Sequence, residues 1–504
     1  MDPAPYTRAM ADEPEVPVEP EADEASSHDI PLPEHLREAI SRDWDPAPPM
    51  PHPATPDVAP QAARRRAALS ALFRGKLIVV PAGVPKVRAN DTDYPFRAAS
   101  SLTWLTGETT AEAVLVMTPN GDGHESALYL REYAQAGEPD YFTGRVHGAL
   151  WVGNVPSLAD SEQVLGLRTR PLGALAADLA PYRDDAAALL RGFDPSVDAL
   201  LPHGADAHLV ETLDELRLTK DEWELGRLAY ACEATARGFA DVVRELPTVL
   251  GRADVRGERW LEGTFWRRAR LEGNEVGYTA IVGSGTHATT LHWWRNHGSV
   301  APGGLLLADM GVETDELYTA DVTRTMPVSG EWSPAQLKVY RAVLEAQAAG
   351  IAEVKAGADF YAPHRAAMYV LADHLHSWGV LPVTAEVSCD EDPDRPGAGL
   401  HRRYTLHSTS HMLGIDVHDC AQAREEVYRD GTLAAGYVLT VEPGLYFQAN
   451  DRSAPEEFRG IGVRIEDDIA VTDGAARNLS AMLPRDPDEV TSWMREVQGT
   501  PAAP

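Results

Sequence analysis

The sequence predicts an α/β protein with two folded domains, an N-terminal α/β domain and a larger C-terminal domain of helices and paired strands. From residue 62 onward, apolar strand-like runs alternate with helical segments. Near residues 207–222 this pattern changes to long amphipathic helices that flank paired strands. A chain of 504 residues also exceeds a single ordinary hydrophobic core. These observations together predict the two domains.

The composition excludes several kinds of partner and site. A formal net charge of −32 would repel a phosphate backbone, so nucleic acid is not expected as a partner. No apolar run approaches the roughly 20 residues that cross a bilayer, and the N-terminus does not resemble a secretory signal. A cytoplasmic enzyme without a membrane partner is therefore expected. The cysteines Cys232, Cys389 and Cys420 are far apart, which predicts neither disulfides nor a thiolate metal site.

Both ends of the chain differ in composition from its middle. Residues 1–55 are rich in Pro, Glu, Asp and Ala, which predicts a disordered acidic arm with one short helix from Glu34 to Trp44. Residues 486–504 are expected to form a flexible tail. The N-terminal α/β domain is predicted over residues 56–210 and the C-terminal domain over residues 211–485.

Each domain has recognisable elements. In the N-terminal domain we expect a helix in RRRAALSALF, strands in KLIVVPA, AEAVLVM and ESALYL, a hairpin turn at GDG (121–123) and helix near 174–190. The C-terminal domain is expected to begin with a helix that starts at a capping box in TKDE (219–222) and stops at Pro247. The apolar stripe of this helix includes Cys232, which predicts a buried, inert thiol.

The stretch LLLADMGVETDELYTADVTRTM (305–326) predicts a hairpin that carries two acids. With its turn centred near Asp315, Asp309 and Asp321 would lie opposite one another on one face, about 4.5 to 5.5 Å apart at Cβ. Two bare carboxylates at that separation would repel each other, and two divalent metals about 3.5 to 4 Å apart would fit between them. The alternative is a solvated hairpin edge with two unrelated acids.

Further candidate ligands follow in strand-like, glycine-punctuated stretches. They are His292 at the end of a strand in YTAIVGSGTHATTLHWWRN; His407, His411 and His418 in LHSTSHMLGIDVHD; Glu442 in VLTVEPGLY; and Arg464, Glu466 and Asp468 on one strand face in GVRIEDDIAV. An acid in a strand as apolar as VLTVEP is costly unless it is paired or bound to a metal. His407 alone could be a satisfied core histidine, and Arg464 could form an ordinary ion pair.

These motifs, with NDTDYPFRAASSLTWLTG (90–107), resemble the metallopeptidase family with the pita-bread fold, which contains methionine aminopeptidase, prolidase and aminopeptidase P. The chain is most similar to aminopeptidase P, over about residues 62–480. The resemblance implies a pita-bread C-terminal domain that binds two divalent ions, with manganese as the expected metal. The implied ligands are Asp309, Asp321, His411, Glu442 and Glu466, of which Asp321 and Glu466 bridge both ions.

The resemblance also implies a mechanism. A metal-bridging hydroxide attacks the peptide bond that precedes proline, and Glu442 acts as general base. His292 and His418 match active-site histidines that stabilise the oxyanion or move a proton. His407 and Arg464 complete the implied set, with Arg464 holding the hydrogen bonds of the site. The expected substrates are peptides with proline at the second position.

The resemblance further implies a homo-oligomer, a tetramer or dimer, in which a neighbouring N-terminal domain closes the active-site mouth. Asp91 matches a residue that reaches such a site, and Phe142 lies where the similar bacterial enzyme has a pocket tryptophan. That enzyme also separates the two aspartates by one residue fewer. We expect the loop from Glu313 to Glu316 to take up the extra residue.

Other functions are compatible with parts of this pattern. A prolidase specific for Xaa-Pro dipeptides, or a relative that hydrolyses organophosphates, would use the same metal chemistry. A non-catalytic binding protein with the same fold is a third alternative. Such proteins usually lose ligands, whereas all five positions are filled here.

Overall fold

The structure is a computed structural model that describes residues 32–48, 50–55, 57–90, 92–182 and 187–499. The chain divides into two compact units, Met1–Pro51 with Glu132–Ser157, and His52–Arg131 with Leu158–Pro504. No helix within the described ranges is long and apolar enough to cross a membrane. The predicted domain limits at residues 56–210 and 211–485 stay a prediction.

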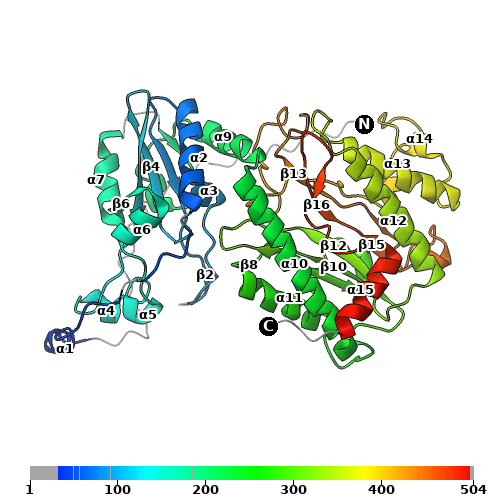
Figure 1. Cartoon of the computed structure of the whole chain (residues 1–504), viewed down its shortest axis with the longest axis horizontal. Helices are drawn as coiled ribbons and strands as arrows, with labels where there is room; N and C mark the ends of the chain where they lie inside the picture. Colours follow the sequence, from blue (N-terminus) through cyan, green and yellow to red (C-terminus); the bar gives the residue numbers. More distant parts are fainter. Residues whose placement is uncertain (1–31, 49, 56, 91, 183–186, 500–504) are drawn as a thin grey trace, which may run out of the picture. The chain divides into compact units, whose positions relative to one another are not determined.

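Helices are found throughout the described residues. They are α1 (Glu34–Ile40), α2 (Val58–Leu72), α3 (Ser100–Thr106), α4 (Asp140–Thr143), α5 (Ala149–Val152), α6 (Leu158–Leu165), α7 (Leu175–Leu179), α8 (Pro195–Asp198), α9 (Asp206–Leu218), α10 (Glu222–Val249), α11 (Gly257–Glu272), α12 (Pro334–Ala352), α13 (Ala362–Ser377), α14 (Ala385–Ser388) and α15 (Pro487–Gly499) (Figure 1).

The strands are short and mostly antiparallel. They are β1 (Ile78–Pro81), β2 (Val87–Ala89), β3 (Thr92–Asp93), β4 (Val114–Asn120), β5 (Gly123–Leu130), β6 (Arg168–Pro171), β7 (Ala188–Leu189), β8 (Glu275–Val276), β9 (Ile281–Ser284), β10 (Leu305–Met310), β11 (Val312–Glu313), β12 (Val322–Pro327), β13 (Val438–Val441), β14 (Gly444–Tyr446), β15 (Gly462–Arg464), β16 (Asp467–Ala470) and β17 (Arg477–Asn478).

The smaller unit contains α1, α4 and α5. Helix α1 lies within the helix predicted from Glu34 to Trp44 and ends at Ile40. Most of the predicted acidic arm lies outside the described residues.

A five-stranded sheet in the order β6-β5-β4-β1-β7 forms the N-terminal part of the larger unit. Asn120 pairs with Gly123, and Gly121 takes a left-handed φ of 59°. The predicted hairpin turn at residues 121–123 is therefore confirmed. Helix α7 and a 3-10 helix at Ala180–Tyr182 lie where helix was expected near 174–190, and residues 183–186 fall outside the described ranges. The prediction is wrong at the end of this stretch. Ala188 and Leu189 instead form β7, which is parallel to β1.

The C-terminal part repeats one arrangement of a helix pair with short strands. Helices α10 and α11 pack side by side and are followed by the sheet β12-β10-β9 (Figure 1). Helices α12 and α13 also pack side by side and are followed by the sheet β13-β16-β17 and the pair β14-β15. The site residues lie on these strands and on the segments between them.

The long helix α10 begins later and ends later than predicted. Its N-cap is Asp221, which forms a capping box with Glu224, so the box predicted from Thr219 and Glu222 is wrong. Thr219 caps the end of α9 instead. The D-x-x-E spacing fits the same capping geometry two residues further along.

Pro247 does not stop α10, which continues to Val249. Proline at this position removes the donor that would bond the carbonyl of Val243. The side chain of Gln498 in α15 donates to that carbonyl at 3.2 Å. Helix α15 buries Val490, Met494 and Val497, so the prediction of a flexible tail from residue 486 is wrong for the described residues to 499.

The hairpin formed by β10 and β12 pairs Asp309 with Thr323 and Met310 with Val322. This register differs by two residues from the predicted one, so Asp309 and Asp321 are diagonal neighbours on one face rather than direct partners. The turn closes with a hydrogen bond of 2.8 Å from the amide of Thr314 to the carbonyl of Tyr318. The continuous pairing keeps both acids on one face, as expected if the turn takes up the extra residue.

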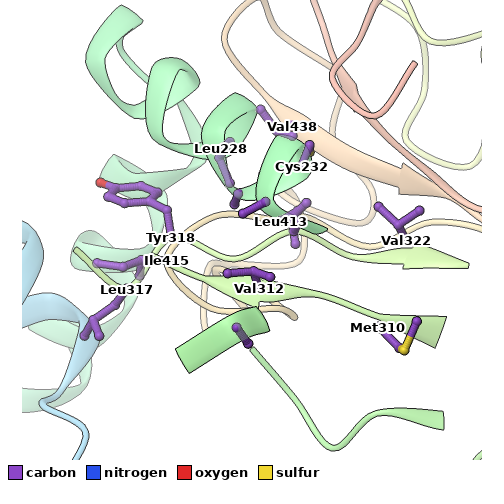
Figure 2. Close-up of a cluster of buried hydrophobic side chains, with 14 of the residues drawn as sticks. Leu228, Cys232, Met310, Val312, Leu317, Tyr318, Val322, Leu413, Ile415 and Val438 are labelled. Atoms are coloured by element: carbon purple, nitrogen blue, oxygen red, sulfur yellow. The ribbon is translucent and has the colours of Figure 1, made fainter. Parts of the chain in front are cut away.

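A buried apolar cluster supports the back of this hairpin (Figure 2). It joins Leu228 and Cys232 of α10 to Val312 and Val322 of the hairpin and to Leu413 of a later loop. Cys232 is fully buried, as predicted. The same core therefore holds the hairpin and the loop that follows His411.

Leu228→Ala tests the importance of this cluster. Leu228 is fully buried, and truncating a buried leucine costs about 2 to 5 kcal/mol because a cavity remains. We expect a clear fall in the apparent midpoint of thermal unfolding. Leu271→Ala on α11 is the control, since that side chain is 68% exposed and should leave the midpoint nearly unchanged. Equal midpoints for both variants would contradict the prediction.

Candidate active site and metal centre

Asp309 lies near the end of β10 and is held by two donors. An Arg464 guanidinium nitrogen lies 2.6 Å from its Oδ2, and the Tyr278 hydroxyl donates to its Oδ1 at 2.6 Å. Burial raises the pKa of Asp309, and the charge of Asp321 adds to this effect while Arg464 opposes it. The ion pair of Arg464 is therefore with Asp309, one of the predicted metal ligands.

Asp321 lies directly before β12, and its backbone is fixed by another buried acid. Its amide donates to Oδ2 of Asp468 at 3.1 Å, and the Cys232 thiol donates to the same oxygen at 3.1 Å. The Oδ2 atom of Asp321 lies 3.2 Å from Nε2 of His411. Burial would raise the pKa of Asp321, but the hydrogen bond and charge of His411 outweigh it and lower that pKa.

His411 lies on an irregular segment that runs beside β13. Its carbonyl accepts from the amide of Thr440 at 3.0 Å, and its own amide donates to the Thr440 hydroxyl at 3.2 Å. Its ring Nδ1 lies 3.1 Å from the carbonyl of Met412, a group that can only accept, so Nδ1 carries the hydrogen. The other nitrogen, Nε2, therefore faces the acids, with Glu442 Oε1 at 3.6 Å.

Glu442 and Glu466 lie at the ends of strands rather than inside them. Glu442 directly follows β13, and its amide donates to the carbonyl of Thr409 at 2.9 Å. Glu466 lies between β15 and β16, which divide the single strand predicted over GVRIEDDIAV. Its carboxylate accepts from the Thr323 hydroxyl at 2.5 Å. Burial raises the pKa of Glu442 to about 8 and that of Glu466 well above its usual range.

The donor set suits a cation. One ligand atom from each of Asp321, His411 and Glu466 lies within 4.8 Å of the others. Asp309 brings a buried carboxylate and Glu442 a partly buried one to the same group, and nearby acids contribute to the raised pKa values of both. A divalent cation would relieve this repulsion, and oxygen-rich sets of this kind bind hard cations.

His407 is held in one tautomer beside this group. Its Nδ1 lies 2.8 Å from the carbonyl of Ser408, so Nδ1 carries the hydrogen, and Nε2 lies 2.9 Å from the Tyr446 hydroxyl. Burial and the charge of Arg464 lower the pKa of His407 to about 3. His407 is therefore a neutral ring whose Nε2 accepts a hydrogen bond from the Tyr446 hydroxyl.

The acids open into a cavity of about 920 Å³. Nine of the predicted residues line it: His292, Asp309, Asp321, His407, His411, His418, Glu442, Arg464 and Glu466. The rings of His411 and His418 lie edge to face at 4.3 Å, and burial together with the charge of His411 lowers the pKa of His418. His292 follows a 3-10 helix at Gly285–Thr289, so it does not end a strand as predicted.

The two predicted substrate-binding residues stay predictions. Asp91 falls outside the residues that the structure describes. Phe142 lies in α4 of the smaller unit, where its ring contacts Trp44 and Tyr141, and its role stays a prediction.

Sequence reasoning missed several residues that hold the site. Tyr278, Thr323 and Tyr446 donate to or accept from the acids and Arg464. Asp468, a candidate in the sequence, instead accepts from the amide of Asp321. Tyr278 and Tyr446 both lie within motifs that carry the candidate ligands. Their position next to those ligands was the available signal.

Comparisons with known proteins identify the family of the chain. Residues 226–473 match metallopeptidase family M24, and residues 62–188 match the aminopeptidase P N-terminal domain. The chain is 51% identical over 449 residues to Xaa-Pro aminopeptidase 2 of Streptomyces coelicolor, covering 88% of this chain and 93% of that protein.

Solved structures from Escherichia coli are also similar. Aminopeptidase P with the inhibitor Pro-Leu has a TM-score of 0.75 at 26% identity, covering 88% of this chain and 99% of that one. The zinc-substituted enzyme in complex with product has a TM-score of 0.74 at 26% identity, covering 87% and 98%. The predicted fold class is confirmed by these matches. The chain belongs to metallopeptidase family M24 and, within it, to the Xaa-Pro aminopeptidases of the aminopeptidase P type.

Proposed function

We propose that this Xaa-Pro aminopeptidase works with two divalent cations, with manganese as the native metal. The ligands would be Asp309, Asp321, His411, Glu442 and Glu466. Membership of the family implies divalent metal ions and peptide substrates with proline at the second position. The observation that carries the proposal is the convergence of His411 Nε2 with the carboxylates of Asp321 and Glu466.

The donor chemistry supports this choice of metal. Four carboxylates and one imidazole form an oxygen-rich set, which favours manganese over a structural zinc. Each of three ligands has one side fixed by the protein: Asp309 by Arg464, His411 by the carbonyl of Met412, and Glu466 by Thr323. Such outer contacts orient ligands before a metal binds.

The protein groups around the cavity suit hydrolysis of a peptide bond. Bound divalent cations would lower the pKa of the attacking water and polarise the scissile carbonyl. Glu442 lies at the cavity surface and would accept the proton of that water. Nε2 of His411 lies 3.6 Å from Oε1 of Glu442 and orients this carboxylate toward the other ligands.

The leaving nitrogen of a proline carries no hydrogen in the peptide and must gain a proton to leave. Glu442 would pass its proton toward that nitrogen, and His418 and His292 line the same cavity. These histidines would stabilise the oxyanion or help to move the proton. Arg464 and His407 also line the cavity, and both contact the Tyr446 hydroxyl, so they would hold the hydrogen bonds of the site in place.

We also propose a cytoplasmic homo-oligomer, a dimer or tetramer. Three consecutive apolar side chains of α5 support an interface: Leu150, Trp151 and Val152 are each about half exposed.

Sedimentation of the intact chain should give a mass of two or four copies, and Leu150→Asp should shift that mass toward one copy. A monomeric wild type would contradict this proposal.

Glu442→Ala should reduce hydrolysis of Xaa-Pro peptides by at least about 100-fold, because general bases contribute roughly 10²- to 10⁴-fold. Steady-state kinetics measure the effect, and circular dichroism should show an intact fold. Glu457→Ala is the matched control, since this exposed glutamate lies away from the cavity lining. Full activity of the Glu442 variant would refute its role as base.

Removal of metal should abolish hydrolysis of Xaa-Pro-Yaa tripeptides, and Mn²⁺ should restore it. Calorimetric titration of the metal-free protein should show two ions per chain, as expected for five ligands shared between two ions. Peptides of different lengths separate this activity from that of a prolidase, which would cleave Xaa-Pro dipeptides and spare tripeptides. Persistent activity after complete chelation would contradict a metal mechanism.

A further inference from the structure

The loop between His411 and His418 contacts a group of charges, four of them buried and two partly exposed, that the proposed chemistry does not use. We call this group the arginine cluster; its members are Arg97, Arg217, Lys220, Glu313, Asp416 and Asp419. It connects residues near α3 and α9 to the hairpin that carries Asp309 and Asp321 and to the loop that carries the two histidines. The cluster lies outside the cavity lining.

Arg97 contacts the hairpin and the loop with one side chain. Its Nε donates to Glu313 Oε2 at 2.6 Å, and a terminal nitrogen donates to the carbonyl of Ile415 at 2.6 Å. The same terminal nitrogen lies 3.2 Å from Oδ1 of Asp416. The rigid, planar guanidinium fixes these acceptors relative to one another in a way that a flexible ammonium would not.

Glu313 connects Arg97 to the hairpin. It lies in β11, between Asp309 and Asp321, and its side chain is almost fully buried. Its other oxygen accepts from the Asn274 side chain at 2.8 Å. A shift of Glu313 would therefore move the segment that joins the two acids.

The second half of the cluster fixes the far end of the loop. Asp419 directly follows His418, and it pairs with Arg217 at 2.9 Å and with Lys220 at 3.0 Å. Arg217 also lies 3.2 Å from Asp416. Three of these four side chains are at most 6% exposed, so the loop cannot turn without breaking buried ion pairs.

Ile415 contacts both the arginine cluster and the apolar core. Its side chain packs in the cluster behind the hairpin while its carbonyl accepts from Arg97 (Figure 2). A buried charge network is weak support for stability, because desolvation offsets most of the attraction. The network contributes here by fixing the position of the loop relative to the hairpin.

We propose that Arg97 is a positioning residue that sets the separation between the acids of the hairpin and the histidines of the loop. It acts through Glu313 and through the backbone at Ile415. The inference rests on the proposed metal centre, because its consequence is the geometry of the ligand set.

Arg97→Gln is the decisive variant, and Mn²⁺ binding to the metal-free chain, measured by calorimetry, is the readout. We expect affinity to fall by roughly 10- to 100-fold, the range for lost outer-shell contacts, and kcat to fall more than KM changes. Arg191→Gln is the matched control. It removes an arginine with four comparable contacts to Asp206 and nearby carbonyls, so it should lower the thermal midpoint and leave Mn²⁺ affinity unchanged.

Arg97→Lys keeps the proposal testable if Arg97→Gln folds poorly. It keeps the charge but cannot make all the contacts of the guanidinium, so its affinity should lie between those of the wild type and the glutamine variant. Glu313→Gln combined with Arg97→Gln should lower Mn²⁺ affinity little more than Arg97→Gln alone, because both changes break the same Arg97–Glu313 contact.

The outcomes separate this inference from the proposed function. A wild type that binds no divalent ion would refute the metal centre itself. Normal Mn²⁺ affinity in Arg97→Lys, or in a folded Arg97→Gln, would overturn only the positioning role. Equal losses of affinity in the Arg97 and Arg191 variants would assign the effect to general destabilisation and would overturn it as well.

Discussion

Repulsion among four carboxylates, three of them buried, is the constraint on which the rest of the C-terminal part depends. Asp309, Asp321, Glu442 and Glu466 share one small space, and burial together with the neighbouring acids raises the pKa of Asp309, Glu442 and Glu466. Acids in this arrangement would separate or bind protons unless the backbone fixed them and a cation compensated them. The strands, the hairpin turn and the buried core behind them hold these groups together against that repulsion.

The side chains behind the ligands show how the fold meets this constraint. Arg464 spans three contacts: it binds Asp309, the Thr323 hydroxyl and the Tyr446 hydroxyl. Thr323 in turn donates to Glu466. One buried cation therefore orients a ligand from β10 and, through one hydroxyl, a ligand that follows β15. These contacts leave the opposite face of each ligand directed toward the cavity.

The sequence contained the chemistry of the site more clearly than its geometry. The sequence alone singles out the acid that follows VLTV and the histidines in HSTSH, because burying ionisable groups costs free energy unless they are paired or bound to a metal. The hairpin register was not visible, since its turn places Leu317 at φ 70°, a conformation that leucine rarely takes. Burial of Leu317 in the apolar core accompanies that strain. Likewise, Pro247 stays within α10 because Gln498, far along the chain, binds the carbonyl that it leaves free.

Contacts across long sequence distances explain why the arginine cluster could not be predicted. Arg97 and Glu313 are 216 residues apart, and neither lies in a pattern that names the other as a partner. Apolar packing could hold the loop equally firmly, but it tolerates small rotations that a planar guanidinium with four acceptors resists. A ligand set needs direction as well as stability, because an error of about 0.5 Å is enough to impair a functional site. That requirement gives a physical reason for a buried charge network directly behind the histidine loop.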